Sequence, residues 1–122
     1  MTRGSDIRYT LILKNIELKE IGEVYATIEQ DRGNRTGDDI EVTKYGKVTY
    51  DEDGVPTEDE NNQVHFDYEH NAVLLDLDQK DTLMFESGTA EVQLRMISVY
   101  GTIIGTLTNR IRVNPVLYTK VL

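Results

Sequence analysis

Cysteine is absent from this chain of 122 residues. Its absence excludes disulfide bonds, thiolate metal sites and thiol nucleophiles, and it leaves the redox compartment open. Long apolar runs are missing too. The run Leu11–Leu13 is shorter than the roughly 7 to 15 residues of a signal-peptide core, and no run approaches the roughly 20 residues of a membrane-spanning helix. We therefore expect a soluble protein made in the cytosol, with no membrane partner.

Basic residues are scarce. The chain has 13 Lys and Arg residues against 22 Asp and Glu residues, for a formal net charge of −9. Because affinity for phosphate groups depends on clustered Lys and Arg, no nucleic-acid partner is expected. The acidity is concentrated between Asp51 and Glu60, a segment that contains no basic residue. The length fits a single domain over residues 1–122, able to bury about two thirds of the unfolded chain's surface.

Alternation of apolar and polar residues, the period of a strand with one buried face, is the main pattern present. The alternation predicts strands over 7–13, 24–30, 40–44, 64–69, 73–77 and 91–97, a return strand from Ile103 and a closing strand at 111–113. Turn residues separate these segments at intervals typical of sandwiches. We therefore predict an all-β fold, an immunoglobulin-like antiparallel β-sandwich of about seven strands, with a closed barrel as the alternative.

Two short segments have a helical pattern. Asp78 is a favourable helix N-cap, and the Asp81 carboxylate is placed to favour a helix N-terminus. One short helical turn is therefore predicted over 78–85. A second turn is predicted over 16–21, because its apolar spacing fits a helix better than a strand.

Residues 45–62 combine glycine, proline and carboxylates. This composition predicts an acidic insertion that projects from the domain, with no more than a short edge strand at 47–50. Asp51, Asp53 and Glu60 match the third, fifth and twelfth positions of a calcium-binding loop, whereas the first position lacks its carboxylate. These three residues are a calcium-site hypothesis, set against the default of a solvated acidic loop.

Candidate catalytic groups are few. His65, His70 and Asp67 carry metal-ligating atoms, but their spacing matches no metal motif. The serines lie in no nucleophile-elbow pattern, and the glycines form no phosphate-binding loop. We therefore expect no enzymatic activity, no catalytic residue and no cofactor.

Protein contacts are expected where apolar or tyrosine side chains lie in polar surroundings. Tyr25 falls on the polar face of its predicted strand, and tyrosine is favoured where a surface is both apolar and wet. The C-terminal region is too apolar for a free end. Its predicted interface residues are Ile111, Val113, Val116, Leu117 and Tyr118.

Two parts of the chain carry a family resemblance. They are the opening Met1-Thr2-Arg3-Gly4 and the run from Leu77 to Leu122, which includes Glu91-Val92-Gln93-Leu94-Arg95 and Val113-Asn114-Pro115-Val116-Leu117. These parts resemble small prophage-encoded proteins of bacteria and, more loosely, the immunoglobulin-like N-terminal modules of phage baseplate and tail proteins. The resemblance implies a non-enzymatic phage structural protein, a virion-associated tail or baseplate component or adaptor that acts through its sandwich surfaces.

The same resemblance also implies partners and a location. The partners are other phage structural proteins and copies of the chain itself in a homo-oligomer, contacted by edge-strand pairing or symmetric association. The location is the bacterial cytoplasm during assembly and then the virion.

Two other functions stay open at this point. One is an acidic decoy that imitates a phosphate backbone and occupies a host nucleic-acid-binding protein. A decoy needs negative charge spread along a face, and here the charge is clustered in one segment. The other is a calcium-stabilised adhesion module, for which the first calcium ligand and a signal-peptide pattern are missing.

Overall fold

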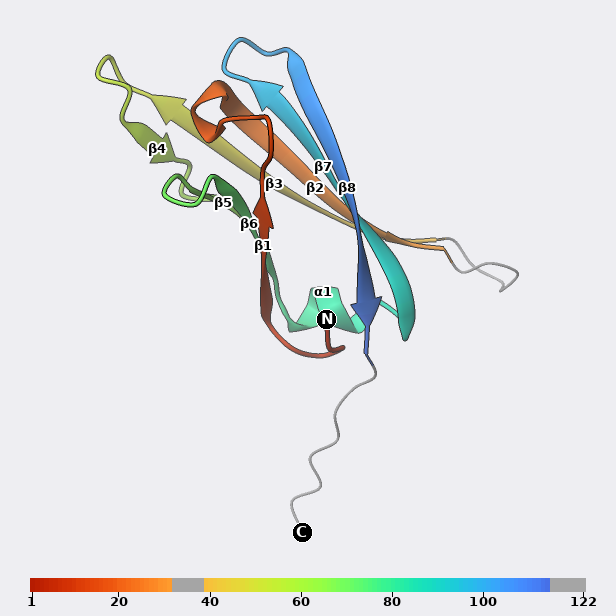
Figure 1. Cartoon of the computed structure of the whole chain (residues 1–122). Helices are drawn as coiled ribbons and strands as arrows, with labels where there is room; N and C mark the ends of the chain where they lie inside the picture. Colours follow the sequence, from red (N-terminus) through yellow and green to blue (C-terminus); the bar gives the residue numbers. More distant parts are fainter. Residues whose placement is uncertain (32–38, 115–122) are drawn as a thin grey trace.

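The structure is a computed structural model that describes residues 1–31 and 39–114. It consists of two antiparallel sheets that face each other (Figure 1). The small sheet has the strand order β1-β6-β5, and the large sheet has the order β4-β3-β2-β7-β8. The strands are β1 (Ile7–Ile12), β2 (Ile21–Gln30), β3 (Ile40–Tyr50), β4 (Pro56–Glu58), β5 (Val64–Asp67), β6 (Ala72–Leu77), β7 (Gly88–Ser98) and β8 (Ile103–Val113). The short helical elements are the 3-10 turn η1 (Leu18–Glu20) and the helix α1 (Gln79–Leu83).

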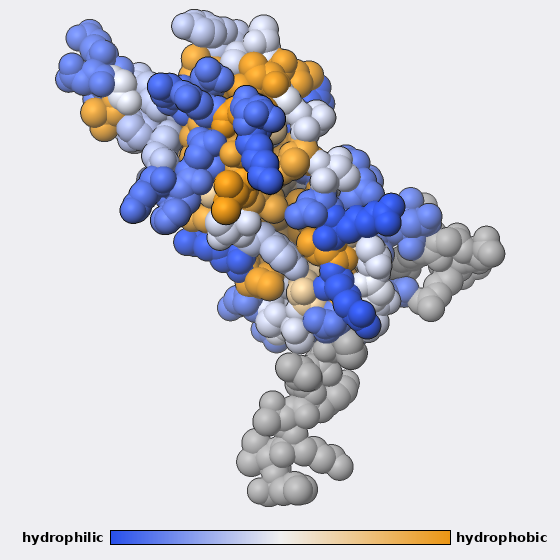
Figure 2. Space-filling model, in the orientation of Figure 1, coloured by the Kyte–Doolittle hydropathy of each residue, from blue (hydrophilic) through white to orange (hydrophobic). Residues whose placement is uncertain are grey.

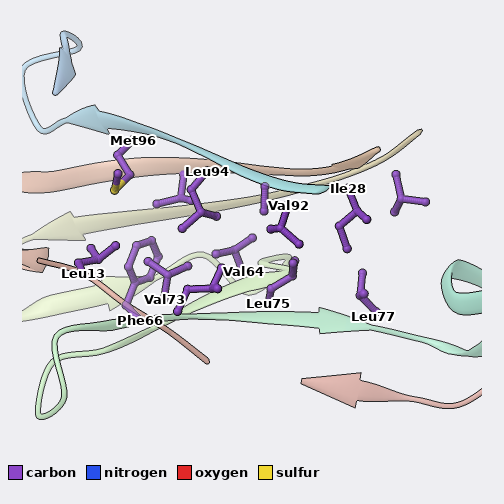
Figure 3. Close-up of a cluster of buried hydrophobic side chains, with 14 of the residues drawn as sticks. Leu13, Ile28, Val64, Phe66, Val73, Leu75, Leu77, Val92, Leu94 and Met96 are labelled. Atoms are coloured by element: carbon purple, nitrogen blue, oxygen red, sulfur yellow. The ribbon is translucent and has the colours of Figure 1, made fainter. Parts of the chain in front are cut away.

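The core lies between the sheets, because each strand turns its apolar alternate residues inward. Figure 3 shows these side chains meeting across the gap, and the labelled ones that come from strands are Ile28, Val64, Phe66, Val73, Leu75, Leu77, Val92, Leu94 and Met96. Burying each of them stabilises the fold by about 1.5–3 kcal/mol relative to exposure. The predicted all-β, sandwich-like architecture is confirmed, and its two separate sheets replace the alternative of a closed barrel.

The helical turn α1 starts as the sequence predicts. Asp78 Oδ1 accepts a hydrogen bond from the Asp81 backbone N–H at 2.9 Å, and Asp81 Oδ2 accepts one from the Asp78 N–H at 3.0 Å. Together these bonds form a capping box. Lys44 Nζ of β3 lies 2.8 Å from the same Asp81 oxygen, and both side chains are largely buried. This ion pair ties the large sheet to the turn that follows β6 of the small sheet.

The acidic segment is more regular than its composition indicates. β3 continues to Tyr50, and β4 lies within 45–62, so part of this region is an antiparallel hairpin that extends from one corner of the large sheet (Figure 1). The predicted end of the strand at Lys44 is therefore wrong. The misleading residue is Gly46, which is depleted in strands. Glycine is needed there for packing, because a Cβ would overlap the Val64 carbonyl group of β5.

The end of the described chain forms one long strand. The return strand predicted from Ile103 and the closing strand predicted at 111–113 are the two ends of β8, which has 11 residues. β8 follows β7 through a turn in which the Ser98 N–H donates to the Thr102 carbonyl at 2.7 Å. Gly101 in this turn has a φ of +86°, which glycine adopts without the strain that a side chain would add.

Candidate functional site

The four outer strands of the two sheets differ in how their free edges are protected. β4 has three residues and begins with Pro56, β5 has four residues and β1 has six. β8 has 11 residues and contains no proline, lysine or carboxylate, and its two arginines lie near its C-terminal end. Short length, proline and charge are the usual devices that stop a sheet edge from pairing with another chain. The β8 edge is therefore the one most open to an added strand.

Pairing with β7 decides which side chains of β8 face the core. Leu107 lies opposite Leu94 on the inward side, yet Leu107 is 36% exposed whereas Leu94 is 1% exposed. Ile103, at the start of β8, is 55% exposed. Figure 2 shows apolar side chains reaching the surface between polar ones on this side of the molecule. The small sheet has three strands and the large sheet has five, so the small sheet covers β8, at the end of the large sheet, only in part.

The C-terminal end of the β8 edge already pairs with the start of the chain. The Met1 ammonium group donates to the Arg112 carbonyl at 2.7 Å. Asn114 N–H donates to the Met1 carbonyl at 2.6 Å, and Arg3 N–H donates to the Asn114 carbonyl at 3.1 Å. The two segments run parallel here. Within the described residues, the open part of the edge is therefore 103–111.

The predicted interface residues of the C-terminal region have different surroundings. Val113 is 1% exposed, and Ile111 is partly buried against the core. These two side chains therefore pack inside the sandwich, and a partner would meet the backbone edge of their strand instead. The other predicted interface residues of this region lie outside the described residues; they are Val116, Leu117 and Tyr118.

Tyr25 belongs to an aromatic pair on the outward face of the large sheet. It is 39% exposed, and its ring centroid lies 4.8 Å from that of Tyr45, its cross-strand neighbour. Partial burial and a hydrogen bond with the Glu23 carboxylate raise the pKa of Tyr45 to about 12. The Tyr45 hydroxyl therefore stays protonated at neutral pH, and the pair presents apolar rings with polar tips. It remains a candidate contact surface.

The acidic residues of the predicted calcium loop shape backbone turns. Asp51 Oδ1 accepts hydrogen bonds from the backbone N–H groups of Asp53 at 2.9 Å and Val55 at 2.8 Å, which closes the β3–β4 turn. Glu60 is exposed beyond β4. In the part of the chain that the structure describes, no group of three or more His, Cys, Asp or Glu side chains could hold a metal ion. The calcium site at Asp51, Asp53 and Glu60 stays a prediction, and in the structure the Asp51 carboxylate is engaged with the backbone of its own turn.

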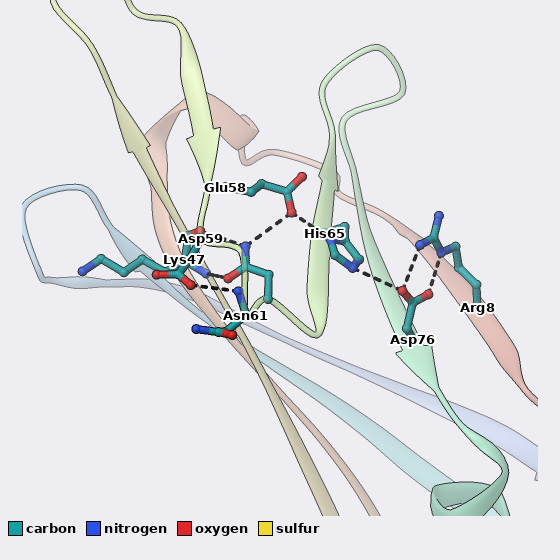
Figure 4. A network of polar contacts seen from close by, with 8 residues as sticks. Arg8, Lys47, Glu58, Asp59, Asn61, His65 and Asp76 are labelled. Carbon is teal, nitrogen blue, oxygen red and sulfur yellow. Dashed lines mark hydrogen bonds and ion pairs between the residues drawn. The ribbon is translucent and has the colours of Figure 1, made fainter.

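A polar network joins four strands beside the acidic segment (Figure 4). His65 Nδ1 of β5 lies 2.8 Å from Glu58 Oε1 of β4, and His65 Nε2 lies 3.2 Å from Asp76 Oδ2 of β6. Arg8 of β1 donates to both Asp76 carboxylate oxygens, at 2.6 and 2.8 Å, and this pairing lowers the pKa of Asp76. His70 pairs with a carboxylate of its own turn at 2.7 Å. The two histidines thus belong to separate polar contacts: that of His65 links β4, β5 and β6, and that of His70 lies within the β5–β6 turn.

A groove of about 720 Å³ lies between the β3–β4 hairpin and the β7–β8 turn. Its lining includes the exposed Tyr100 and two lysines, Lys19 and Lys47. Among the described residues that line it, Glu23 is the single carboxylate and there is no histidine. The groove therefore offers no acid–base pair of the kind that hydrolytic chemistry uses.

Comparison with known proteins leaves the family open. No protein-family model matches the chain, and no curated protein sequence matches it. Across residues 1–31 and 39–114, no helix is long and apolar enough to cross a membrane. The surfaces described above are therefore the features of this chain that point to a function.

The open edge at 103–111 is the candidate that sequence reasoning missed. Between Ile104 and Ile111 the single apolar residue is Leu107, so the alternation predicts two separate strands. A signal was nevertheless present in the charge pattern. No carboxylate side chain follows Glu91 in this otherwise acidic chain, which marks the C-terminal strand pair as different from the rest of the surface.

Proposed function

We propose that this chain is a non-enzymatic interaction protein of a phage particle, a tail or baseplate component or adaptor that joins neighbouring proteins through the free edge of β8. The carrying observation is the open backbone edge at 103–111, which contains no proline, lysine or carboxylate and at whose end residues 1–3 already pair. Addition of a strand to an exposed edge is a common recognition mode, in which main-chain hydrogen bonds supply the affinity.

The phage setting is supported by the resemblance of the N-terminal and C-terminal segments to immunoglobulin-like modules of tail and baseplate proteins. The sandwich-like fold agrees with that resemblance, and we propose an immunoglobulin-like topology for it. A rigid two-layered body suits an adaptor, because it holds an edge strand in a fixed orientation toward its neighbours. In this proposal the chain is made in the bacterial cytoplasm and is then incorporated into the virion.

The distribution of charge favours an adaptor over a nucleic-acid decoy. The carboxylates of 51–60 lie on β4 and its flanking turns, at the opposite edge of the large sheet from β8. The sheet order places about four strand spacings, or about 19 Å, between these two edges. The negative charge is therefore concentrated at one edge, whereas a phosphate mimic needs it along a whole face.

The proposal is tested on nuclease-treated, gradient-purified particles from the induced host. Quantitative mass spectrometry should find the chain in stoichiometric amounts relative to known tail proteins. Replacing Leu107 by lysine puts an inward-pointing charge on the edge strand, a device that blocks edge pairing. We expect Leu107→Lys to reduce incorporation by about one order of magnitude.

The matched control is Thr57→Lys, which adds the same charge to the exposed strand β4 at the opposite edge of the same sheet. It should be incorporated like the wild type. Absence of the wild-type chain from particles, with abundant protein left in the lysate, would overturn the proposal in favour of an assembly factor or decoy. Equal incorporation of both lysine variants would show that the β8 edge is not the contact.

A further inference from the structure

The open part of the β8 edge has a symmetric extent. At one side it begins after the turn that closes at Thr102, and at the other side it ends where residues 1–3 pair with the chain from Arg112 onward. The segment between these limits is 103–111, and its midpoint is Leu107. An edge segment centred on one residue can pair with the same segment of a second copy about a two-fold axis through that residue.

Pairing about Leu107 produces compatible neighbours on both faces. Leu107 would lie opposite its own counterpart on the inward face, and Thr106 opposite Thr108 on the outward face. Apolar pairs and Thr–Thr pairs are favourable across neighbouring strands. A β-bulge at Ile104 places Ile103 opposite Ile97 on the outward face, so the regular pairs about Leu107 are those of residues 105–109.

The charges of the edge also fit this register. Arg110 lies three positions from Leu107, so the two copies of Arg110 stand six residues apart along the strands, a separation of about 20 Å. Within each chain, Glu91 of β7 lies directly opposite Arg110 and offsets its charge. The register therefore brings no like charges face to face.

The acidic hairpin does not oppose such a contact. It occupies the β4 edge, at the far side of the large sheet from β8 in each copy. Charges separated by more than about 8 Å are largely screened at physiological ionic strength, so the net charge of −9 on each chain acts weakly across the contact.

We infer that the partner at this edge is a second copy of the chain, bound antiparallel through β8 with the two-fold axis at Leu107. The contact joins the two large sheets into one continuous sheet and covers the exposed Leu107 side chain with that of its counterpart. This inference rests on the proposed function, because it names the occupant of the edge that the proposed function uses.

Disulfide trapping tests the register directly, because the chain has no cysteine of its own. Directly opposite residues in an antiparallel pair have Cα atoms about 4.5–5.5 Å apart, within the range of a disulfide. Leu107→Cys should therefore oxidise to a covalent homodimer. Thr106→Cys and Thr108→Cys should each stay uncrosslinked, because like positions are then diagonal and about 8 Å apart. A mixture of these two variants should crosslink as a heterodimer.

A charge-swap experiment provides a second, reversible readout. Leu107→Lys and Leu107→Glu each place like charges opposite one another at the axis, so each variant alone should be monomeric by light scattering coupled to size exclusion. Their mixture pairs lysine with glutamate and should restore a dimer. Circular dichroism serves to check that each variant is folded. The control Thr57→Lys should dimerise like the wild type.

The other possible results each overturn the dimer, its register or the proposed function. A wild-type chain that is monomeric at its highest soluble concentration overturns the inference, as does a dimer that persists in both Leu107 charge variants. Crosslinking of Thr106→Cys equal to that of Leu107→Cys overturns the register. If the chain is monomeric but Leu107→Lys is still lost from particles, a strand of another protein occupies the edge, and the proposed function stands without this inference. If the dimer forms as expected but the chain is absent from particles, the proposed function fails instead.

Discussion

Replacing Gly46 by alanine adds a single methyl group, yet it should lower the unfolding free energy by about 3 kcal/mol. A Cβ at Gly46 of β3 would overlap the carbonyl oxygen of Val64 and crowd its side chain. That carbonyl belongs to β5, whose backbone is held by its pairing with β6, so it cannot rotate away as a side-chain end could. Overpacking costs about 1–3 kcal/mol in a well-packed core, and a clash with fixed backbone belongs at the upper end.

Urea unfolding followed by circular dichroism measures this loss, and the melting temperature should fall by about 10 °C for a domain of this size. Gly54→Ala is the matched control. Gly54 has a φ of +78° with no atom within 4 Å of an added Cβ, so its replacement adds backbone strain without a clash. The control should therefore lose only about 1 kcal/mol.

The double variant Gly46→Ala/Val64→Ala separates the two parts of the clash. Because the carbonyl oxygen of Val64 is the nearest atom, removal of the Val64 side chain should not restore stability. Rescue by this second change would show that side-chain crowding, and not the close approach of two backbones, requires glycine. A Gly46→Ala variant as stable as the Gly54→Ala control would refute the packing argument altogether.

Two further predictions concern polar links between elements. The buried Gln30 side chain makes two hydrogen bonds of 2.7 Å with the Glu86 backbone, so Gln30→Ala should lower the urea unfolding free energy by about 2–3 kcal/mol. Gln93→Ala, on an exposed face, should change the unfolding free energy by less than about 0.5 kcal/mol. An equal loss in Gln30→Ala and Gln93→Ala would contradict the stabilising role of the Gln30–Glu86 hydrogen bonds. Arg8 lowers the pKa of Asp76 below its ordinary value of 3.8, so the stability from this pair is present above that pH and is lost as the pH falls through the lower folded-state pKa. Wild type and Asp76→Asn should therefore differ by about 0.5 kcal/mol at neutral pH and converge in acid, whereas a difference independent of pH would count against the pairing.

Local patterns predicted the elements whose structure depends on near neighbours. The alternation at 24–30, 73–77 and 91–97 corresponds to β2, β6 and β7, because a strand with one buried face repeats every two residues. The cap at Asp78 was also predicted, since a capping box involves residues only three positions apart.

The predicted strand end at Lys44 is wrong because a distant contact decides the outcome. Glycine at position 46 indicates a break, although the β3–β5 approach requires it inside a long strand. The calcium hypothesis for Asp51, Asp53 and Glu60 stays a prediction; in the structure the Asp51 carboxylate accepts hydrogen bonds from the backbone of its own turn. Spacing along the chain does not reveal which donors a carboxylate meets after folding.

The candidate site likewise combines features that the local sequence predicts with one that depends on distant contacts. The order of residues predicts an all-β chain without cysteine chemistry, with a cluster of acidic residues in one segment and no carboxylate side chain after Glu91. That β8 is an outer strand with an open edge at 103–111 follows from the folded arrangement, because strand order depends on packing between distant segments. A period of two residues states which face of a strand is buried, but it carries no information about whether the strand's backbone has a neighbour on both sides.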